Sequence, residues 1–329
     1  MVICFGTRPE WLKIKPVYEN MECKILFTGQ HQDLVEGITP DMSMTIDTSS
    51  NRLDSIISSC ITNFPDFQDT MVMVQGDTAS AYGCALAAFH RGKTLIHLEA
   101  GLRTYEKTPW PEEGYRQMIS RIADINLCPT SKAMTNLLNE SVSGECFVTG
   151  NTILDNINPE GAYYGNTVLV TMHRRENQER MQDWFEEINK VAKDLDFILP
   201  IHPSLNRSEV EEMLSNVRVI DPVPHPQLID IIKRCRFVIT DSGGIQEECA
   251  FLNKKAIVCR VSTERQEGVD SGHLVLCSTP EEFADIYKTV YTGYEISEPC
   301  PFGNGQAADK IKSIIVSVEG QSKYIDFER

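Results

Sequence analysis

The chain has 329 residues, which is too long for one typical core and enough for two domains. Its formal net charge of -16 would repel nucleic acid and anionic lipid, so we expect neither as a partner. No apolar run approaches the roughly 20 residues of a membrane helix, and no basic region precedes the first apolar stretch, so a signal peptide is not expected. The 11 cysteines are scattered singly, a pattern typical of the reducing cytoplasm, where we expect the protein.

Short apolar runs rich in valine and isoleucine alternate with helix-length amphipathic segments along the chain. This alternation predicts an α/β protein built from doubly wound parallel sheets, each covered by helices on both faces. The predicted strands are 2–6, 23–28, 71–75, 94–98, 124–128, 167–171, 197–201, 217–220, 236–240, 255–259 and 274–277. The predicted helices include 78–91, 113–121, 131–139, 179–194, 225–233, 244–252, 280–291 and 307–318.

The best domain boundary is the stretch 156–166, which is rich in Asn, Pro, Gly and Tyr and has neither helix nor strand periodicity. It divides the predicted strands into two similar sets. We therefore expect two doubly wound domains that face each other across a cleft.

Polar residues directly follow many of the predicted strands. In parallel α/β sheets, ligands bind at the loops just beyond the C-terminal ends of the strands. Acids and bases from both halves of the chain should therefore meet at these edges. The strand-end segments are Gly6-Thr7-Arg8-Pro9-Glu10, Gly76-Asp77-Thr78, Glu99-Ala100-Gly101-Leu102-Arg103, His173-Arg174-Arg175-Glu176, His202-Pro203 and Asp241-Ser242-Gly243-Gly244.

The segment from Asp241 to Glu248 predicts a strand-to-helix turn that can bind a phosphate. Gly243 and Gly244 allow close approach of the backbone, and the helix N-terminus offers free N–H groups. An acidic residue of this turn, Glu247 or Glu248, could bind ribose hydroxyls. The plain alternative is that Asp241 or Ser242 only caps the helix.

The common nucleotide fingerprints GxGxxG and GxxxxGK[ST] are absent, which argues against NAD and ATP. Basic residues near the strand-end loops are instead available for a diphosphate. They are Arg8, Lys13, His173, Arg174, Arg175 and Arg265.

The first half of the chain is rich in carboxylates at the same kind of position. Asp77, Glu99, and either Glu112 or Glu113 predict acid–base chemistry on a phosphorylated substrate. The alternative for Asp77 is helix capping, and Glu112 and Glu113 would equally suit the first turn of a helix.

Taken together, the motifs resemble the non-hydrolysing UDP-N-acetylglucosamine 2-epimerases in order and spacing over roughly residues 2–312. The start Gly6-Thr7-Arg8-Pro9-Glu10, where hydrolysing relatives carry GTRA, favours the non-hydrolysing branch. The other matching segments are residues 75–78, 97–104, 110–113, 148–152, 173–177, 241–248 and 263–265.

The resemblance implies two Rossmann-like domains of the glycosyltransferase-B type, with a C-terminal helix that returns to the first domain. The first domain would be 1–156 plus 307–329 and carry the acid–base carboxylates, and the second would be 166–306 and bind UDP. The catalytic residues implied are Asp77, Glu99, Glu112 and His173. The UDP-sugar would be bound by Arg8, Lys13, Arg103, Arg174, Ser242, Gly243, Gly244, Glu248 and Arg265.

The implied reaction is reversible inversion at C2 of a UDP-linked N-acetylamino sugar, by loss of UDP and its re-addition through a glycal. It needs no cofactor and no metal. The default substrate pair is UDP-N-acetylglucosamine and UDP-N-acetylmannosamine, which points to polysaccharide biosynthesis, and we expect a homodimer. Four alternatives stay open: a UDP 6-deoxy-L-amino sugar as substrate, a hydrolysing epimerase, a UDP-sugar glycosyltransferase, and a catalytically inactive sensor of nucleotide sugars.

The sequence departs from the family pattern at three places. Regulated members bind a second UDP-sugar through a glutamine pair and a helix arginine, but Asp33 replaces the second glutamine here and the predicted helix 53–63 has no arginine. Leu228 stands where an aromatic residue would stack on uracil. These departures predict the absence of activation by a second substrate molecule and an altered base pocket.

Overall fold

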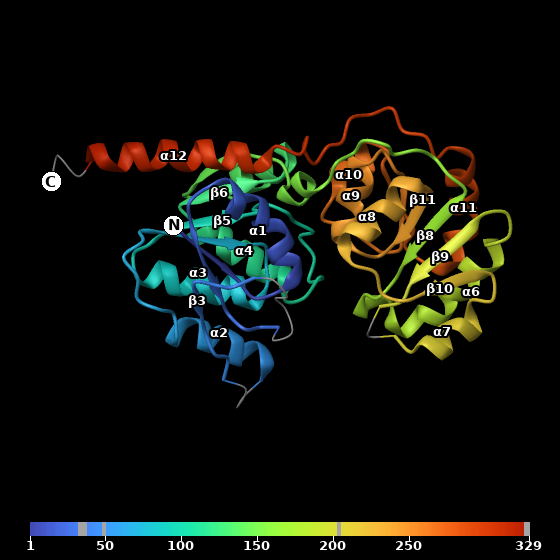
Figure 1. Ribbon diagram of the computed structural model, residues 1–329, viewed down its shortest axis with the longest axis horizontal. Helices are drawn as coiled ribbons and strands as arrows, with labels where there is room; N and C mark the ends of the chain where they lie inside the picture. The colour runs from blue at the N-terminus through green and yellow to red at the C-terminus, as the bar shows by residue number, and fades with distance from the viewer. Residues whose placement is uncertain (32–37, 48–50, 203–204, 326–329) are drawn as a thin grey trace. The chain divides into compact units, whose positions relative to one another are not determined.

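The structure is a computed structural model that describes residues 1–31, 38–47, 51–202 and 205–325; for residues 175, 176 and 320–325 only the backbone is described. Its contacts divide the chain into two units (Figure 1). Unit 1 is Met1–Asn156 with Gly303–Arg329, and unit 2 is Ile157–Phe302.

Unit 1 contains a parallel sheet of seven strands in the order β3-β2-β1-β4-β5-β6-β7. The central strands are apolar throughout because both faces of the sheet are covered. The strands are β1 (Val2–Phe5), β2 (Lys24–Phe27), β3 (Met42–Ser43), β4 (Met71–Gln75), β5 (Thr94–Leu98), β6 (Ile125–Cys128) and β7 (Glu145–Val148).

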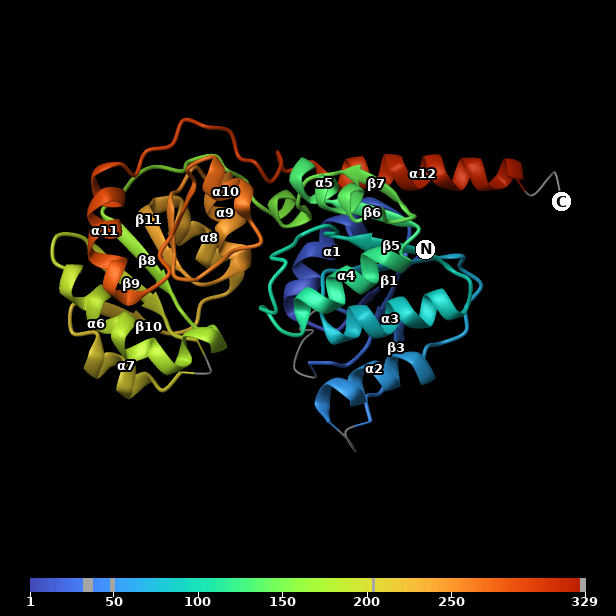
Figure 2. The ribbon, with the colours of Figure 1, turned by 180° about the vertical axis from the view of Figure 1, so that it is seen from behind.

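Successive side chains of these strands point to opposite faces, so the sheet has two cores. On one face, α2 (Arg52–Thr62), α3 (Ala79–His90) and α4 (Glu112–Ile122) pack against it. On the other face, the packing helices are α1 (Arg8–Asn20) and α12 (Ala307–Ile325) (Figure 2). The unit is completed by α5 (Ser131–Asn139) and a short 3-10 helix, η1 (Thr152–Asn156).

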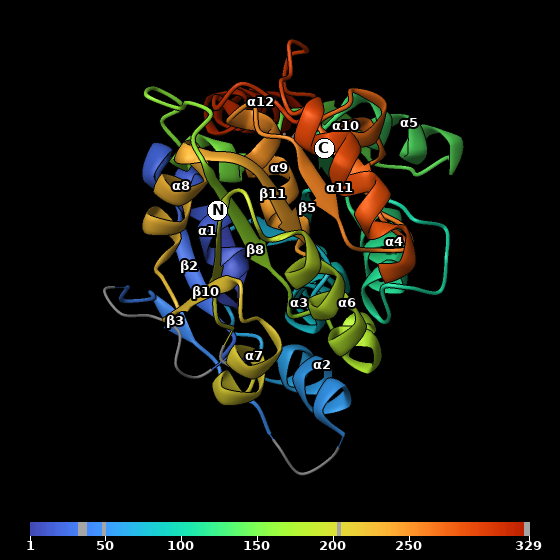
Figure 3. The same ribbon diagram turned by 90° about the vertical axis from the view of Figure 1, so that its right-hand side faces the viewer.

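Unit 2 repeats this plan with six parallel strands in the order β10-β9-β8-β11-β12-β13. Figure 3 shows α8 and α9 on one side of β8 and β11, and α6 and α11 on the other. The strands are β8 (Thr167–Thr171), β9 (Asp196–Pro200), β10 (Val217–Ile220), β11 (Cys235–Thr240), β12 (Ala256–Val258) and β13 (Leu274–Leu276). The helices are η2 (Arg175–Arg180), α6 (Met181–Val191), α7 (Arg207–Met213), α8 (His225–Arg234), α9 (Gly243–Phe251), α10 (Gln266–Asp270), η3 (Pro280–Glu282) and α11 (Phe283–Thr292).

The predicted fold class is confirmed, since both units are α/β with a doubly wound parallel sheet. All eleven predicted strands are present. Two edge strands were not predicted: β3 has only two residues, and β7 has the partly exposed sequence Glu-Cys-Phe-Val, which lacks a continuous apolar run. A strand at the edge of a sheet need not be apolar, so periodicity misses it.

The C-terminal helix α12 belongs to unit 1, as expected. Its apolar residues Ala308, Ile311 and Ile315 are buried in the core that Ile14 and Val17 of α1 share. The Asp155 carboxylate accepts hydrogen bonds from Ala307 N (3.0 Å) and Ala308 N (2.7 Å). The first N–H groups of a helix have no partner within it, so Asp155 satisfies two of them and fixes the start of α12 to η1.

Candidate active site

In each unit the strand order reverses next to the first strand of the sheet. The reversal lies between β1 and β4 in unit 1 and between β8 and β11 in unit 2. Ligands of open α/β sheets bind at such switch points, beyond the C-terminal ends of the strands. The residues that follow these strands belong to the strand-end segments in which the sequence predicts catalytic or binding side chains.

Glu99 follows β5 with a backbone φ of 67°, in the left-handed region that residues other than glycine rarely adopt. Its carboxylate accepts hydrogen bonds from Lys13 Nζ and Gln75 Nε2, and from Asn151 Nδ2 at 3.1 Å. Its side chain is only 9% exposed. A strained backbone and three donors on one carboxylate are typical of a functional site.

Lys13 was predicted to bind the diphosphate, but in this structure its ammonium group pairs with Glu99. The pairing puts a positive charge beside an acid–base candidate within the same unit. Arg8 remains available for an anionic ligand, because it is exposed at the start of α1 and has no ion pair among the described residues.

Asp77 follows β4 and pairs with Arg116 of α4, whose Nη2 lies 2.6 Å from Asp77 Oδ2. The N-cap of α3 is Thr78, whose hydroxyl accepts a hydrogen bond from Ala81 N. The alternative that Asp77 only caps this helix is therefore wrong. Its side chain is 26% exposed, so it can reach a ligand while Arg116 is buried behind it.

Glu10 holds the loops that follow β1 and β4 together. It is buried, and its carboxylate accepts hydrogen bonds from Gly6 N (3.0 Å) and from the Thr78 hydroxyl (2.8 Å). Burial raises the pKa of Glu10, and the hydrogen bonds from Thr7, Thr78 and Gly6 offset part of that rise. Glu10 thus fixes the backbone next to Asp77.

The choice between Glu112 and Glu113 is decided by their contacts. Glu113 is buried and accepts the backbone N–H groups of Thr104 and Tyr105, both at 3.1 Å. This glutamate therefore shapes the loop after β5. Glu112 is half-buried at the first position of α4, which leaves it the better acid–base candidate.

Arg103 was predicted to bind substrate, and its contacts support a structural role instead. Its guanidinium is buried in a two-bond ion pair with Glu140 (2.7 and 2.9 Å) and also donates to Leu102 O. A planar guanidinium that already makes this paired contact is fixed in place.

In unit 2, Asp241 is fully buried at the end of β11 and organises the neighbouring loop. Its carboxylate accepts hydrogen bonds from His173 N, Arg174 N and Asn177 Nδ2 at 2.9–3.2 Å. The N-cap of α9 is Ser242, and its side chain makes no capping hydrogen bond. Asp241 therefore positions the loop after β8, and Ser242 is not occupied as a cap.

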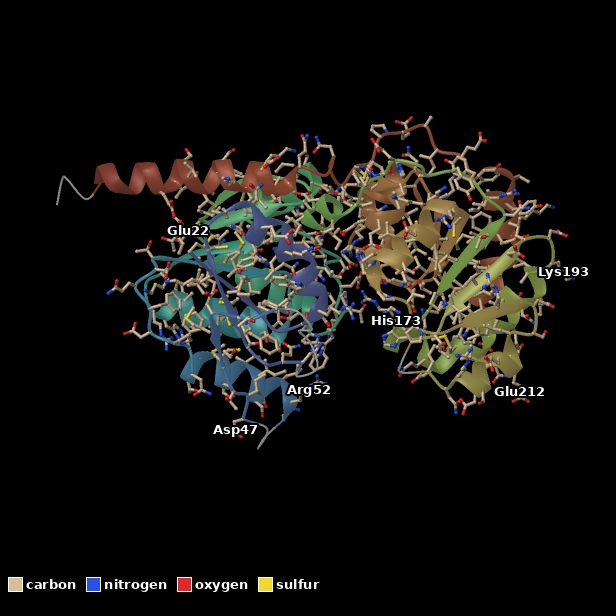
Figure 4. The ribbon with its side chains drawn as sticks, in the orientation of Figure 1. Glu22, Asp47, Arg52, His173, Lys193 and Glu212 are labelled. Atoms are coloured by element: carbon tan, nitrogen blue, oxygen red, sulfur yellow. The ribbon has the colours of Figure 1, made fainter. Side chains whose placement is uncertain are left out.

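His173 (labelled in Figure 4) has a half-buried ring. This ring stacks on that of His202, with ring centroids 4.5 Å apart. Its Nδ1 lies 3.6 Å from Asp241 Oδ1. Burial lowers the pKa of His173, and the nearby Asp241 carboxylate opposes that shift. The ring is therefore held mainly neutral near pH 7.

The turn before α9 combines an open glycine with a buried arginine. A Cβ on Gly244 would meet no atom within 4 Å, whereas a Cβ on Gly243 would lie 2.7 Å from Arg265 Nη1. Arg265 Nε donates to Glu247 at 2.8 Å, and its Nη1 pairs with Glu264. The two carboxylates fix the guanidinium against the glycine turn.

Glu248, the acidic residue at the end of this motif, has one carboxylate oxygen in use and one without a partner among the described residues. Oε1 lies 2.6 Å from His225 Nε2, and Oε2 is buried. A buried carboxylate oxygen needs a donor. A ligand hydroxyl would supply one, so Glu248 rather than Glu247 is the candidate for a ribose.

The profile of the family described as UDP-N-acetylglucosamine 2-epimerase matches residues 17–316. The chain belongs to this family. The UDP-N-acetylglucosamine 2-epimerase of Salmonella borreze is 33% identical, over 97% of this chain and 98% of the relative, and that of Campylobacter jejuni is 32% identical, over 96% and 97%. The solved structure of UDP-GlcNAc 2-epimerase from Neisseria meningitidis bound to UDP-GlcNAc has a TM-score of 0.86 at 28% identity, over 96% of this chain and 99% of that chain.

Two of the three departures from the family pattern can be compared with the structure. Asp33 lies outside the described residues. The helix predicted at 53–63 begins one residue earlier, at Arg52, so the prediction that it lacks an arginine was wrong (Figure 4). The pKa of His31 is lowered by burial and by the charge of Arg52. A cation therefore does lie near this segment, so of the departures at Asp33 and in this helix only Asp33 still predicts the absence of a second UDP-sugar site. Leu228 is half-buried on α8, and the altered base pocket stays a prediction.

Among the described residues, no group of three or more His, Cys, Asp or Glu side chains is placed to hold a metal ion. No helix in the described part of the chain is both long and apolar enough to cross a bilayer.

Three residues that contact the candidate site residues were not assigned a role from the sequence: Arg116, Asn151 and His225. Arg116 had a signal because it follows Glu112 by one helical turn, and Asn151 had one because it lies in the matching segment 148–152.

His97, on β5, should make the stability of the protein depend measurably on pH. Its ring is buried, with Nε2 2.8 Å from Gly76 O and Nδ1 3.0 Å from the Ser120 hydroxyl. Burial lowers its pKa to about 4. Below the ordinary pKa of 6.5 the unfolded chain binds a proton that the folded chain refuses, so stability is full above pH 6.5 and declines toward pH 4.

We therefore predict that His97 lowers the free energy of unfolding of the wild type by about 2 kcal/mol when the pH falls from 7.5 to 5. In His97→Gln that part of the pH dependence should disappear, because glutamine does not titrate. Urea unfolding of both proteins at the two pH values measures it. Parallel pH dependence in the two proteins would contradict a neutral, buried His97.

Proposed function

We propose that this chain catalyses the reversible, non-hydrolysing C2 epimerisation of UDP-N-acetylglucosamine to UDP-N-acetylmannosamine. The observation that carries the proposal is the set Asp77, just after β4, Glu99, directly after β5, and Glu112, at the first position of α4, all in unit 1. The family relationship supports the substrate. A glycosyltransferase would need an acceptor site and has less use for three such acids.

The chemistry follows from the weak acidity of the C2–H bond. A base removes the C2 proton while the C1–O bond breaks and UDP leaves with its electron pair, which forms a glycal with a C1=C2 double bond. Protonation of C2 from the opposite face and re-addition of UDP at C1 give the epimer. Two faces require an acid–base group on each, which supports the use of several carboxylates.

Unit 2 is proposed to bind the UDP group. The turn Ser242-Gly243-Gly244 and the N-terminus of α9 would accept the diphosphate, with Arg265 against Gly243 and with Arg174 as a further cation of this unit. His173, which burial keeps neutral and whose Nδ1 lies 3.6 Å from Asp241 Oδ1, would donate a hydrogen bond to the departing diphosphate. The buried Oε2 of Glu248 would accept a ribose hydroxyl.

None of the 11 cysteines forms a disulfide in the described part of the chain, which supports the proposed cytoplasmic location. The homodimer stays a prediction, to be tested by sedimentation of the purified chain. The same holds for the role in polysaccharide biosynthesis, which the product UDP-N-acetylmannosamine would serve.

Elimination and re-addition predict that product formed in deuterated water carries deuterium at C2 and stays attached to UDP. NMR of the C2 position during incubation with UDP-N-acetylglucosamine measures both. Release of free N-acetylmannosamine would establish the hydrolysing alternative. No reaction with this substrate, but turnover of a UDP 6-deoxy-L-amino sugar, would establish the other one.

Replacing Asp77, Glu99 or Glu112 by its amide should lower turnover by roughly 100-fold or more, because an amide keeps the size but cannot transfer a proton. UDP affinity, measured by calorimetry, should barely change, since unit 2 is proposed to bind the nucleotide. The control is Glu113→Gln, which should instead lower the melting temperature, because its carboxylate accepts two backbone N–H groups. Full activity in Glu99→Gln would be the most damaging result for this mechanism.

Gly244→Ala should leave folding intact, because the added methyl group meets no atom of the protein within 4 Å. The methyl group would, however, occupy the side from which a phosphate approaches, so we expect UDP affinity to fall about ten-fold or more, a loss of about 1.4 kcal/mol or more. Gly243→Ala should weaken both binding and stability, since its Cβ would press on Arg265. Unchanged UDP affinity in Gly244→Ala would place the nucleotide elsewhere.

A further inference from the structure

The amide of Asn151 contacts Glu99 from a segment distinct from the strands of the sheet. Asn151 is buried, with 3% of its surface exposed, and precedes η1. Its Oδ1 accepts a hydrogen bond from Ile153 N at 3.2 Å, and its Nδ2 donates to Glu99 Oε1 at 3.1 Å. The backbone donor at Ile153 requires an acceptor, so the amide orientation is determined and its NH₂ group must face Glu99.

This segment is also where the chain leaves unit 1 and where it returns. η1 ends at Asn156, the last residue before unit 2, and the chain re-enters at Gly303. A Cβ on Gly303 would lie 3.1 Å from Gly150 Cα, and Asp155 binds the start of α12. The two connecting segments are therefore fixed to each other beside Asn151, and Asn151 is held by more than its own turn.

Several charged and titratable groups surround Glu99 and can influence its protonation. Lys13 of α1 and Gln75 of β4 contact the carboxylate directly. The charges of Arg103 and of Arg116 of α4 lie close enough to act on the neighbouring His97, and each is already paired, with Glu140 and with Asp77. His97, with a pKa of about 4, is neutral through the working pH range. The buried carboxyl of Glu10 bonds to Gly6 and Thr78.

We propose that Asn151 is a positioning residue that aims the Glu99 carboxylate and sets its protonation equilibrium from the segment that connects the two units. The inference rests on the proposed function, in which Glu99 transfers the C2 proton. A donor to the charged form of a carboxyl group favours that form, and a second negative charge disfavours it. Lys13 alone leaves the carboxylate free to rotate about its charge contact, whereas Asn151 and Gln75 bond one oxygen each.

The test is Asn151→Asp. Aspartate has the same shape and can still accept the hydrogen bond from Ile153 N, but it replaces the donor to Glu99 by a negative charge. The limb of the pH–rate profile that reports Glu99 should move to higher pH by about one unit or more. Asn151→Ser, which keeps a capping oxygen but cannot reach Glu99, should move it in the same direction by less. Gln75→Glu, which places a charge at the other oxygen from β4, should also move it upward.

The matched control is Asp155→Ala, in the same connecting segment. It removes the acceptor for Ala307 N and Ala308 N, so it should lower the melting temperature, but it should leave the position of both limbs unchanged. A limb shift in Asp155→Ala as large as that in Asn151→Asp would mean that loosening the segment is enough, and would overturn the specific role of Asn151.

A double-mutant cycle separates this inference from the proposed function. In a Glu99→Gln background, which cannot titrate at this position, Asn151→Asp should cause no further loss of turnover. If Glu99→Gln is inactive but Asn151→Asp leaves the profile of the wild-type background unmoved, the inference fails and the proposed function stands. If Asn151→Asp does not fold, the profile of Asn151→Ser decides. If Glu99→Gln keeps full activity, the proposed function itself fails.

Discussion

A carboxylate removed from water must be compensated by cations or N–H donors, and this requirement determines how the strand-end loops of both units are built. Glu10 gathers Gly6 N and the Thr78 hydroxyl, so two loops beside the first strand of unit 1 share one anchor. In unit 2, Asp241 gathers two backbone N–H groups and an asparagine amide from the loop after β8. Because each acid has at least one donor from a loop distant in sequence, the acids fix the loops relative to the sheet.

The same requirement separates acids that build the site from acids able to react. Glu113 and Asp241 are buried and each accepts two backbone N–H groups, so a proton transferred to either would cost several hydrogen bonds. Asp77 and Glu112 are partly exposed, and Asp77 uses one oxygen for its pair with Arg116. Glu99 lies between these two classes. Its donors are side chains that can be replaced one at a time, which makes its protonation adjustable by mutation.

The fold class and the strand-end positions of the candidate site residues could be predicted because both follow from local patterns. Apolar runs mark buried strands, and in a parallel sheet the residue after each run lies at the ligand edge, which placed Asp77, Glu99 and Ser242. The pairings could not be predicted, since a partner such as Asn151 is separated from Glu99 by 52 residues. The same reason explains why Lys13 and Arg103 were assigned to a ligand. The sequence does not distinguish a basic side chain that pairs with a distant carboxylate from one that binds phosphate.

Glu248 shows what an incompletely compensated acid implies. Its Oε1 has His225, but its buried Oε2 has no partner among the described residues. Glu10, Glu113 and Asp241, in contrast, each accept two or more hydrogen bonds from the protein itself. Under the proposed function a ribose hydroxyl donates to Oε2, and this hydrogen bond to a charged group would be worth roughly 1.5–3 kcal/mol. An oxygen left unsatisfied in the free protein favours binding because the ligand relieves its desolvation.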